Sequence, residues 1–134
     1  MTAVERGVLD TSVFIAAESG RQLAAAALPA VAAVSVVTVA ELQAGVLAAA
    51  TTSVRSRRLT TLAAVADIEV LNVDEAVTLE WARIRVSLAE AGRRLNVNDS
   101  WIAATALAHG LAIITQDDNF DHLTELTGLA VVRV

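Results

Sequence analysis

The sequence has no cysteine, no lysine and no tyrosine, and its single proline is Pro29. Without cysteine the chain can form neither a disulfide framework nor a thiolate metal site, so a reducing compartment suits it. The first residues also lack the basic-then-apolar pattern of a secretory signal. We therefore expect a cytoplasmic protein.

Positive charge is scarce. All ten basic residues are arginine, against fifteen acidic residues, and the formal net charge is −5. This balance argues against a protein that coats nucleic acid through a basic surface, but it does not exclude a nuclease. The uncharged stretch from Gln22 to Ala40 is rich in alanine and contains Pro29, which disfavours a membrane span. The six glycines are scattered singly, without a phosphate-binding G-x-G-x-x-G or Walker loop.

Hydrophobic residues make up 55% of the 134 positions, enough for the core of one domain that spans residues 1–134. Apolar strand-like segments alternate with helical patterns, which predicts an α/β fold with a mostly parallel sheet and helices on both faces. The expected strands are Gly7–Asp10, Val31–Val37, Glu69–Val73, Leu111–Thr115 and Ala130–Val134. The expected helices are Thr11–Ser19, Arg21–Leu28, Thr38–Ala50, Ser53–Ala66, Asp74–Ala91, Asn98–His109 and a short turn at Phe120–Leu126.

Acidic residues lie near the carboxyl ends of these strands. The four are Asp10 at the end of the first strand, Glu41 one helical turn beyond the second, Asp99 at the start of the helix before the fourth, and Asp117 just past that strand. In an open α/β sheet the functional crevice lies outside the carboxyl ends of the strands. We therefore expect four carboxylates from four distant segments to face one crevice.

Each of these acids also has an explanation as a helix cap. Asp10 precedes a helix, Thr38 to Glu41 has the T-x-x-E form of a capping box, and Asp99 lies in a first helical turn. Asp117 either caps Phe120–Leu126 or holds a turn. Caps are needed at every helix start, whereas these four acids are expected at one edge of the sheet. Carboxylates gathered there repel one another and need a cation. Their hard oxygen atoms suit Mg²⁺ or Mn²⁺.

Four segments resemble the successive motifs of PIN-domain ribonucleases, in order: VLDTSVFIA, TVAELQAG, NDSWIAATALAHG and IITQDDNF. The whole length is similar to that of VapC-type toxins of toxin–antitoxin pairs. The resemblance implies an α/β/α sandwich with a small mostly parallel sheet, and Mg²⁺-dependent hydrolysis of RNA phosphodiester bonds.

Position by position, the same resemblance implies roles for individual residues. Asp10, Glu41, Asp99 and Asp117 become the metal-binding acids, with Ser12 and Thr115 as hydroxyl supports. Family members often carry an acid where this chain has Asn119, and Asp118 stands at a variable position. The resemblance further implies a cognate antitoxin as partner and a homodimer, for which the apolar Thr38–Ala50 segment offers surface.

Other residues invite alternative roles. An RNA substrate would contact arginines, and the foremost candidates are Arg55, Arg57, Arg58, Arg93 and Arg94. The same residues are equally well explained as solvated charges on helices and loops. His109 and His122 would be the acid–base pair of a metal-free mechanism, although His109 also suits a helix C-terminus. Trp81 and Trp101 lie in apolar helical patterns that favour core packing over base stacking. A non-catalytic PIN-like binding module and a small-molecule phosphohydrolase are the rival functions.

Overall fold

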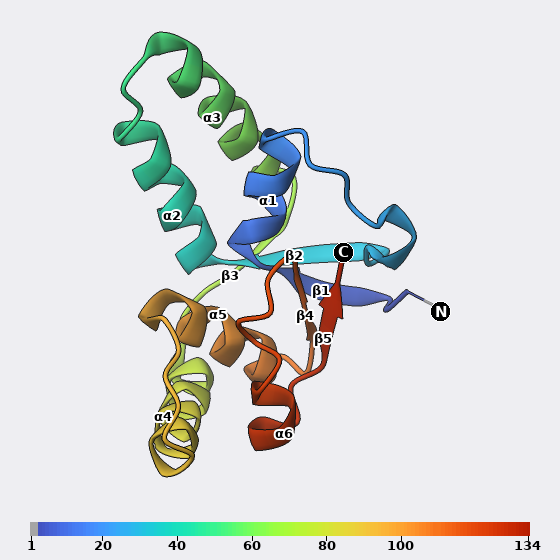
Figure 1. Cartoon of the computed structure of the whole chain (residues 1–134), viewed down its shortest axis with the longest axis vertical. Coiled ribbons are helices and arrows are strands. Elements are labelled where there is room, and N and C mark those ends of the chain that lie inside the picture. The colour runs from blue at the N-terminus through green and yellow to red at the C-terminus, as the bar shows by residue number, and fades with distance from the viewer. Residues whose placement is uncertain (1–2) are drawn as a thin grey trace.

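The computed structural model describes residues 3–134. Five of its segments form a sheet with the strand order β3-β2-β1-β4-β5 (Figure 1). The strands are β1 (Arg6–Leu9), β2 (Val31–Ser35), β3 (Glu69–Leu71), β4 (Ala112–Thr115) and β5 (Val131–Arg133). All four strand pairings are parallel. The helices are α1 (Thr11–Glu18), α2 (Val36–Leu47), α3 (Thr52–Val65), α4 (Glu75–Glu90), α5 (Val97–Ala108) and α6 (Leu123–Thr127).

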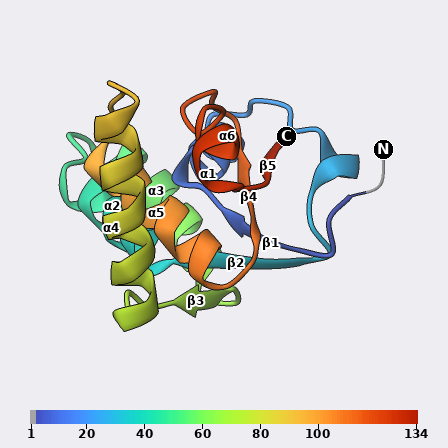
Figure 2. The ribbon, with the colours of Figure 1, turned by 90° about the horizontal axis from the view of Figure 1, so that it is seen from below.

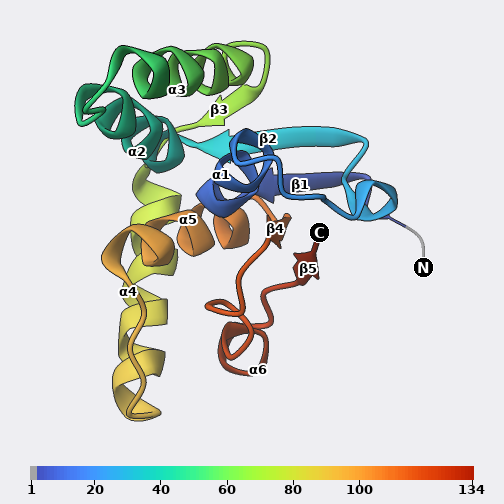
Figure 3. The same ribbon diagram turned by 45° about the horizontal axis from the view of Figure 1, so that its top comes forward.

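The sheet lies between two helical layers. Successive strand residues point to opposite faces, so Val8 and Ile113 join a core with α4, α5 and α6. Their neighbours Leu9 and Ile114 join a second core with α1, α2 and α3. Figure 3 shows these two groups of helices on opposite sides of the strands, whereas the view from below in Figure 2 superposes them. The expected α/β/α sandwich with a parallel sheet is confirmed.

One predicted helix is absent. The segment Arg21–Leu28 forms only a 3₁₀ turn at Ala25–Ala27. Leu28 is extended, with φ −67° and ψ 144°, as expected for a residue before Pro29. None of the three residues in the turn is buried. Alanine favours helix formation, but here no apolar face of the segment packs on the core. A short helix without such packing is only marginally stable.

The second strand ends earlier than predicted. Its expected range was Val31–Val37, but β2 stops at Ser35, and α2 begins at Val36. The Ser35 side chain caps the helix by accepting a hydrogen bond from the backbone N–H of Val37 at 3.1 Å. Thr38 consequently lies inside the first turn of α2, so the proposed Thr38–Glu41 capping box is wrong.

Glycines end two of the helices as predicted. Gly20 and Gly92 follow α1 and α4 with φ values of +75° and +65°, in the left-handed region that favours glycine. Within residues 3–134 no helix is both long and apolar enough to cross a membrane. Because the strands are parallel, the residues after β1, β2 and β4 all emerge at one edge of the sheet.

Candidate active site

Asp10 stands at this edge, directly after β1. Its backbone N–H donates to the carbonyl of Ile114 on β4 at 2.8 Å, which fixes its position beside that strand. The side chain is only 2% exposed, and its Oδ2 accepts hydrogen bonds from Ser12 at 2.7 Å and Thr115 at 2.9 Å. Asp10 occupies the N-cap position of α1, yet its side chain makes no cap hydrogen bond. The two hydroxyls, rather than a helix cap, are therefore the main hold on this carboxylate, and the backbone N–H of Ser12 adds to them.

The two hydroxyls that hold Asp10 also hold the loop after β4. Each hydroxyl has one proton, which it gives to Asp10, and each accepts a backbone N–H with its oxygen. Ser12 accepts from Gln116 at 3.0 Å, and Thr115 accepts from Asp117 at 3.0 Å. The start of α1 and the loop that carries Asp117 are thus fastened to the same carboxylate.

Glu41 reaches the site from α2. Its Oε1 accepts a hydrogen bond from the Thr11 hydroxyl at 2.7 Å. Thr11 Oγ1 also lies 3.0 Å from the hydroxyl of Thr38, and since the Thr11 proton goes to Glu41, Thr38 is the donor of that bond. Thr11 and Thr38 are both buried. Sequence reasoning assigned neither of them a place in the site; the available signals were the run Asp10-Thr11-Ser12 and the Thr38–Glu41 helical spacing.

Asp99 is half-buried in the first turn of α5, where Asn96 is the cap and accepts from the N–H of Asn98 at 2.9 Å. The pKa of Asp99 is raised to about 6, first by burial and then by the negative charges of Asp10, Glu41 and Asp117. Asp99 therefore lies within electrostatic range of the other three carboxylates, although burial is the larger cause of its shift.

The pKa of Asp10 is subject to opposing effects. Burial and the charge of Asp117 raise it, whereas hydrogen bonds from Ser12 and Thr115 to the ionised carboxylate lower it. Burial is the largest effect, and the pKa of Asp10 is raised. Asp117 does not cap α6, because that helix begins at Leu123 with His122 at its N-cap position. The capping explanation thus fails for Asp117, while the α5 dipole still acts on Asp99.

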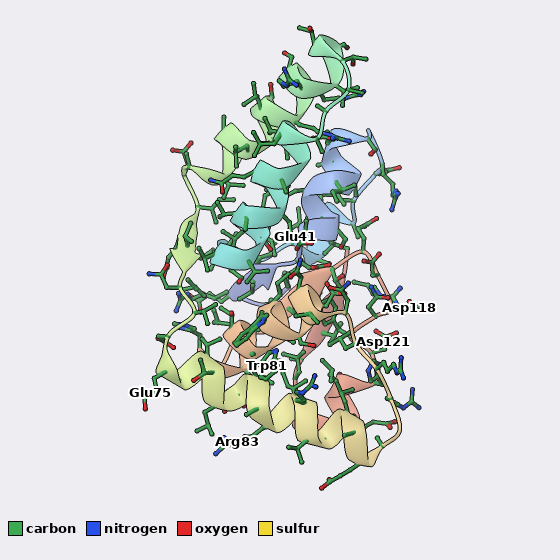
Figure 4. All side chains as sticks on the ribbon, turned by 90° about the vertical axis from the view of Figure 1, so that its left-hand side faces the viewer. Glu41, Glu75, Trp81, Arg83, Asp118 and Asp121 are labelled. Atoms are coloured by element: carbon green, nitrogen blue, oxygen red, sulfur yellow. The ribbon has the colours of Figure 1, made fainter. Side chains whose placement is uncertain are left out.

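The two neighbours of Asp117 differ in their contacts. Asn119 donates from Nδ2 to Oδ2 of Asp99 at 3.5 Å, a long contact that ties the loop to α5. Asp118 is exposed, and Figure 4 shows it at the periphery, away from Glu41. Asn119 rather than Asp118 is therefore the neighbour that touches the acids.

The four acids fit a hard divalent cation in chemistry and charge. All their donors are carboxylate oxygens, which suit Mg²⁺ or Mn²⁺ better than softer metals. The pKa of Asp99 is raised first by burial and then by the negative charges of the other three acids, and a bound cation would offset both effects. Among residues 3–134, however, no three histidine, cysteine, aspartate or glutamate side chains lie close enough together to hold a metal ion as they stand. Glu41 is directed to Thr11, and Asp10 uses Oδ2 for hydroxyls.

A pocket of about 250 Å³ adjoins Glu41 between α1, α2 and α3. Its lining consists of Thr11, Ile15, Glu18, Glu41, Leu42, Gly45 and Arg58. The pocket gives ligands access to Glu41, and it is lined by charged groups of both signs.

Two arginines expected at an RNA surface have structural contacts instead. Arg55 donates to the carbonyl of Ala49 at 3.2 Å, and Arg58 donates to the carbonyl of Gly45 at 2.6 Å. Both bonds fasten α3 to the end of α2. A guanidinium that bridges two helices in this way stabilises their hairpin whether or not RNA is present.

The tryptophans pack against the core, and His109 lies away from the acids. Trp81 and Trp101 stack on each other with ring centroids 4.8 Å apart and pack against the core, which confirms the packing interpretation. His109 is the C-cap residue of α5. Since α5 runs from the carboxyl edge of the sheet back to its amino edge, His109 lies at the opposite end from Asp99. This separates it from the acids.

The comparisons with known proteins agree with this geometry. The PIN domain family matches residues 7–126. Ribonuclease VapC5 of Mycobacterium tuberculosis is 55% identical over 133 residues, which cover 99% of this chain and 98% of the relative. Ribonuclease VapC4 of the same organism is 41% identical over 128 residues, covering 96% and 98%.

A solved structure shares the fold in detail. It is described as a member of the VapBC family of toxin–antitoxin systems, VapBC-5, from Mycobacterium tuberculosis. The matching chain is 52% identical, with a TM-score of 0.90, and the match covers 97% of this chain and 99% of that one. Sequence identity at this level over the full length shows the family as well as the fold. The chain belongs to the PIN-domain family and, within it, to the VapC ribonuclease toxins.

Proposed function

We propose that the chain is a metal-dependent endoribonuclease whose Asp10, Glu41, Asp99 and Asp117 hold Mg²⁺ or Mn²⁺ for hydrolysis of an RNA phosphodiester. The observation that carries the proposal is the chain of hydrogen bonds at this edge of the sheet: Thr115 donates to Asp10 and accepts from the N–H of Asp117, and Asn119 of the same loop donates to Asp99. A structural capping role would not require four acids from separate segments to approach one another. RNA is the substrate class in the names of the relatives.

The hydroxyl contacts define what each acid contributes. Ser12 and Thr115 hold Asp10 through Oδ2, and Oδ1 makes no hydrogen bond within the described residues. Thr11 holds Glu41 through Oε1 in the same way. These carboxylates would hold a divalent cation, which would supply a more acidic water and positive charge opposite the phosphate. The acids therefore serve as ligands positioned by hydroxyls, and no histidine base is needed.

The chemistry of the cleaved ends tests this proposal. Attack of water on phosphorus should leave a 5′-phosphate and a 3′-hydroxyl, and cleavage should stop in EDTA and return with added Mg²⁺. Mapping of the ends on total cellular RNA measures both. Ends that carry a 2′,3′-cyclic phosphate, with full activity in EDTA, would contradict the metal site and favour His109 and His122. Turnover of a phosphomonoester with none of RNA would contradict the substrate class.

The partners follow from the same family. The inference is that a cognate antitoxin binds this chain, as the toxin–antitoxin description of the related structure indicates. A homodimer through α2 is the second expected assembly, and Leu47 near the end of that helix is 82% exposed. At micromolar concentration the chain alone should show twice its mass of 14.0 kDa by light scattering. Leu47→Ser should shift it toward the monomer. A monomeric wild type would contradict the dimer.

A further inference from the structure

A second pocket, of about 400 Å³, lies between α4 and α5 on the other face of the sheet from α2. Trp81 and Arg85 of α4 line it, together with Arg93 and Arg94 of the α4–α5 connection and Ser100 of α5. Ser100 directly follows Asp99 in the same helical turn. The pocket is therefore adjacent in the chain to one of the four acids, but none of the four acids lines it.

The pocket is cationic in an acidic protein. Arg85, Arg93 and Arg94 are exposed, and no aspartate or glutamate lines the pocket with them. Elsewhere among residues 3–134, ion pairs join Arg6 to Glu69, Arg83 to Glu80 and Arg133 to Asp121. None of these pairs involves a pocket arginine. Three unpaired guanidinium groups around one hollow suit an anion, and their planar donor forks match the oxygens of a phosphate.

The tryptophan pair makes the pocket selective for a phosphate rather than a base. Trp101 covers one face of the Trp81 ring, and the guanidinium of Arg85 lies 5.5 Å from the centroid of the same ring. These two contacts occupy the Trp81 ring and leave less of it for stacking of a base. The cation–π contact instead holds Arg85 beside Arg93 and Arg94.

The indole N–H of Trp81 has no hydrogen-bond partner in the described part of the chain. Its Nε1 atom is buried and has no hydrogen-bond acceptor within residues 3–134. Buried indole N–H groups are normally paired, so an unpaired one at a pocket wall calls for an explanation. Because the atom is closed to solvent, a ligand in the pocket would reach it only after the side chains around it move.

We infer that this pocket binds a backbone phosphate of the RNA strand next to the bond that is cleaved. The inference rests on the proposed function, since it takes the strand to lie across Asp99. Beyond the four carboxylates, an acidic protein surface would repel the phosphates of the RNA strand. Cationic side chains next to the site would offset this repulsion. The pocket beside Ser100 provides three such groups, and phosphate contacts of this kind position a strand without reading its sequence.

Binding of a labelled single-stranded RNA measures this role apart from cleavage. The protein carries Glu41→Gln, the buffer contains EDTA, and a gel checks that the strand stays intact. Arg93→Ala combined with Arg94→Ala should raise the Kd at least tenfold at low salt. Each lost phosphate contact should reduce the slope of log K against log salt concentration by about 0.7. Replacement of both residues by lysine should restore part of the affinity, because charge is kept while the planar fork is lost.

The matched control is Arg6→Ala combined with Arg21→Ala. It removes the same charge at exposed positions near the amino edge of the sheet, and it should leave RNA affinity within about twofold. Equal losses in the two double variants would assign the effect to net charge and overturn the inference. Unchanged affinity of the pocket variant would also overturn it, and a changed mass in solution would then assign the pocket to a protein interface. If Glu41→Gln alone still cleaves RNA with Mg²⁺, the proposed function fails while this binding comparison remains valid.

Discussion

Asp10→Asn and Glu41→Gln are each expected to lower RNA cleavage by about a hundredfold or more while the protein stays folded. Loss of a ligand charge removes stabilisation of several kcal/mol from the reacting phosphate, and each ~1.4 kcal/mol corresponds to tenfold in rate. An asparagine oxygen can still accept from Ser12 and Thr115, and a glutamine oxygen can still accept from Thr11. The hydrogen bonds that position the site are therefore kept. Only the charge is lost.

Asp118→Asn is the matched control for these variants. It removes one carboxylate from the same loop as Asp117, but the side chain is exposed and makes no hydrogen bond to another described side chain. Its cleavage rate should stay within a few-fold of the wild type, measured with a labelled RNA and excess Mg²⁺. Full activity in both Asp10→Asn and Glu41→Gln would contradict the metal assignment, whereas equal losses in all three would point to net charge.

The order of strands and helices was accessible from sequence because both sheet faces are covered. The four residues before Thr115 in the last-but-one expected strand are all apolar, as burial on two faces requires. The boundary at Ser35 was less accessible. Valines at 36, 37 and 39 continue the apolar run, so the pattern alone does not distinguish a strand from the start of a helix. The serine cap marks the change, and a serine before an apolar run was the available signal.

The acids of the site were predictable, but the hydroxyls between them were predictable only in part. Asp10 and Asp117 follow parallel strands, and parallel strands bring their carboxyl ends to one edge. Thr11 contacts Thr38 and Glu41 across 27 and 30 residues of chain, so these bonds depend on how α1 and α2 pack. Periodicity describes which face of an element is buried. It does not identify the polar partner that a buried hydroxyl meets there.

Removal of the Asp99 charge is expected to stabilise the protein when no metal is present. The folded pKa of about 6 lies above the value of about 3.9 for a free aspartate. Between these values the native state binds more protons than the unfolded state, so the free energy of unfolding falls as pH rises. The penalty is absent below about pH 4 and complete above the folded pKa. Asp99→Asn should therefore melt a few degrees higher than wild type in EDTA at pH 7.5, with no such gain near pH 4.

Metal should reverse that order. A ligand that binds only the native state stabilises it by about 2.7 kcal/mol at a hundredfold excess over Kd, which for a domain of this size is on the order of 10 °C in Tm. Wild type should gain this from Mg²⁺ or Mn²⁺, and Asp99→Asn should gain much less, because one ligand charge is missing. Added NaCl at equal ionic strength controls for screening of the carboxylates.

The helix-dipole explanation of Asp99 predicts the opposite pattern for the same melts. An anion in the first turn of α5 would stabilise that helix by about 0.3 to 1 kcal/mol, so Asp99→Asn should then melt lower in EDTA. It should also respond to metal like the wild type, since a cap takes no part in metal binding. Four melting curves at pH 7.5, two proteins with and without Mg²⁺, separate the two roles. A lower-melting mutant with an undiminished metal response would contradict the carboxylate cluster, because repulsion that is absent from the folded state cannot be relieved by a cation.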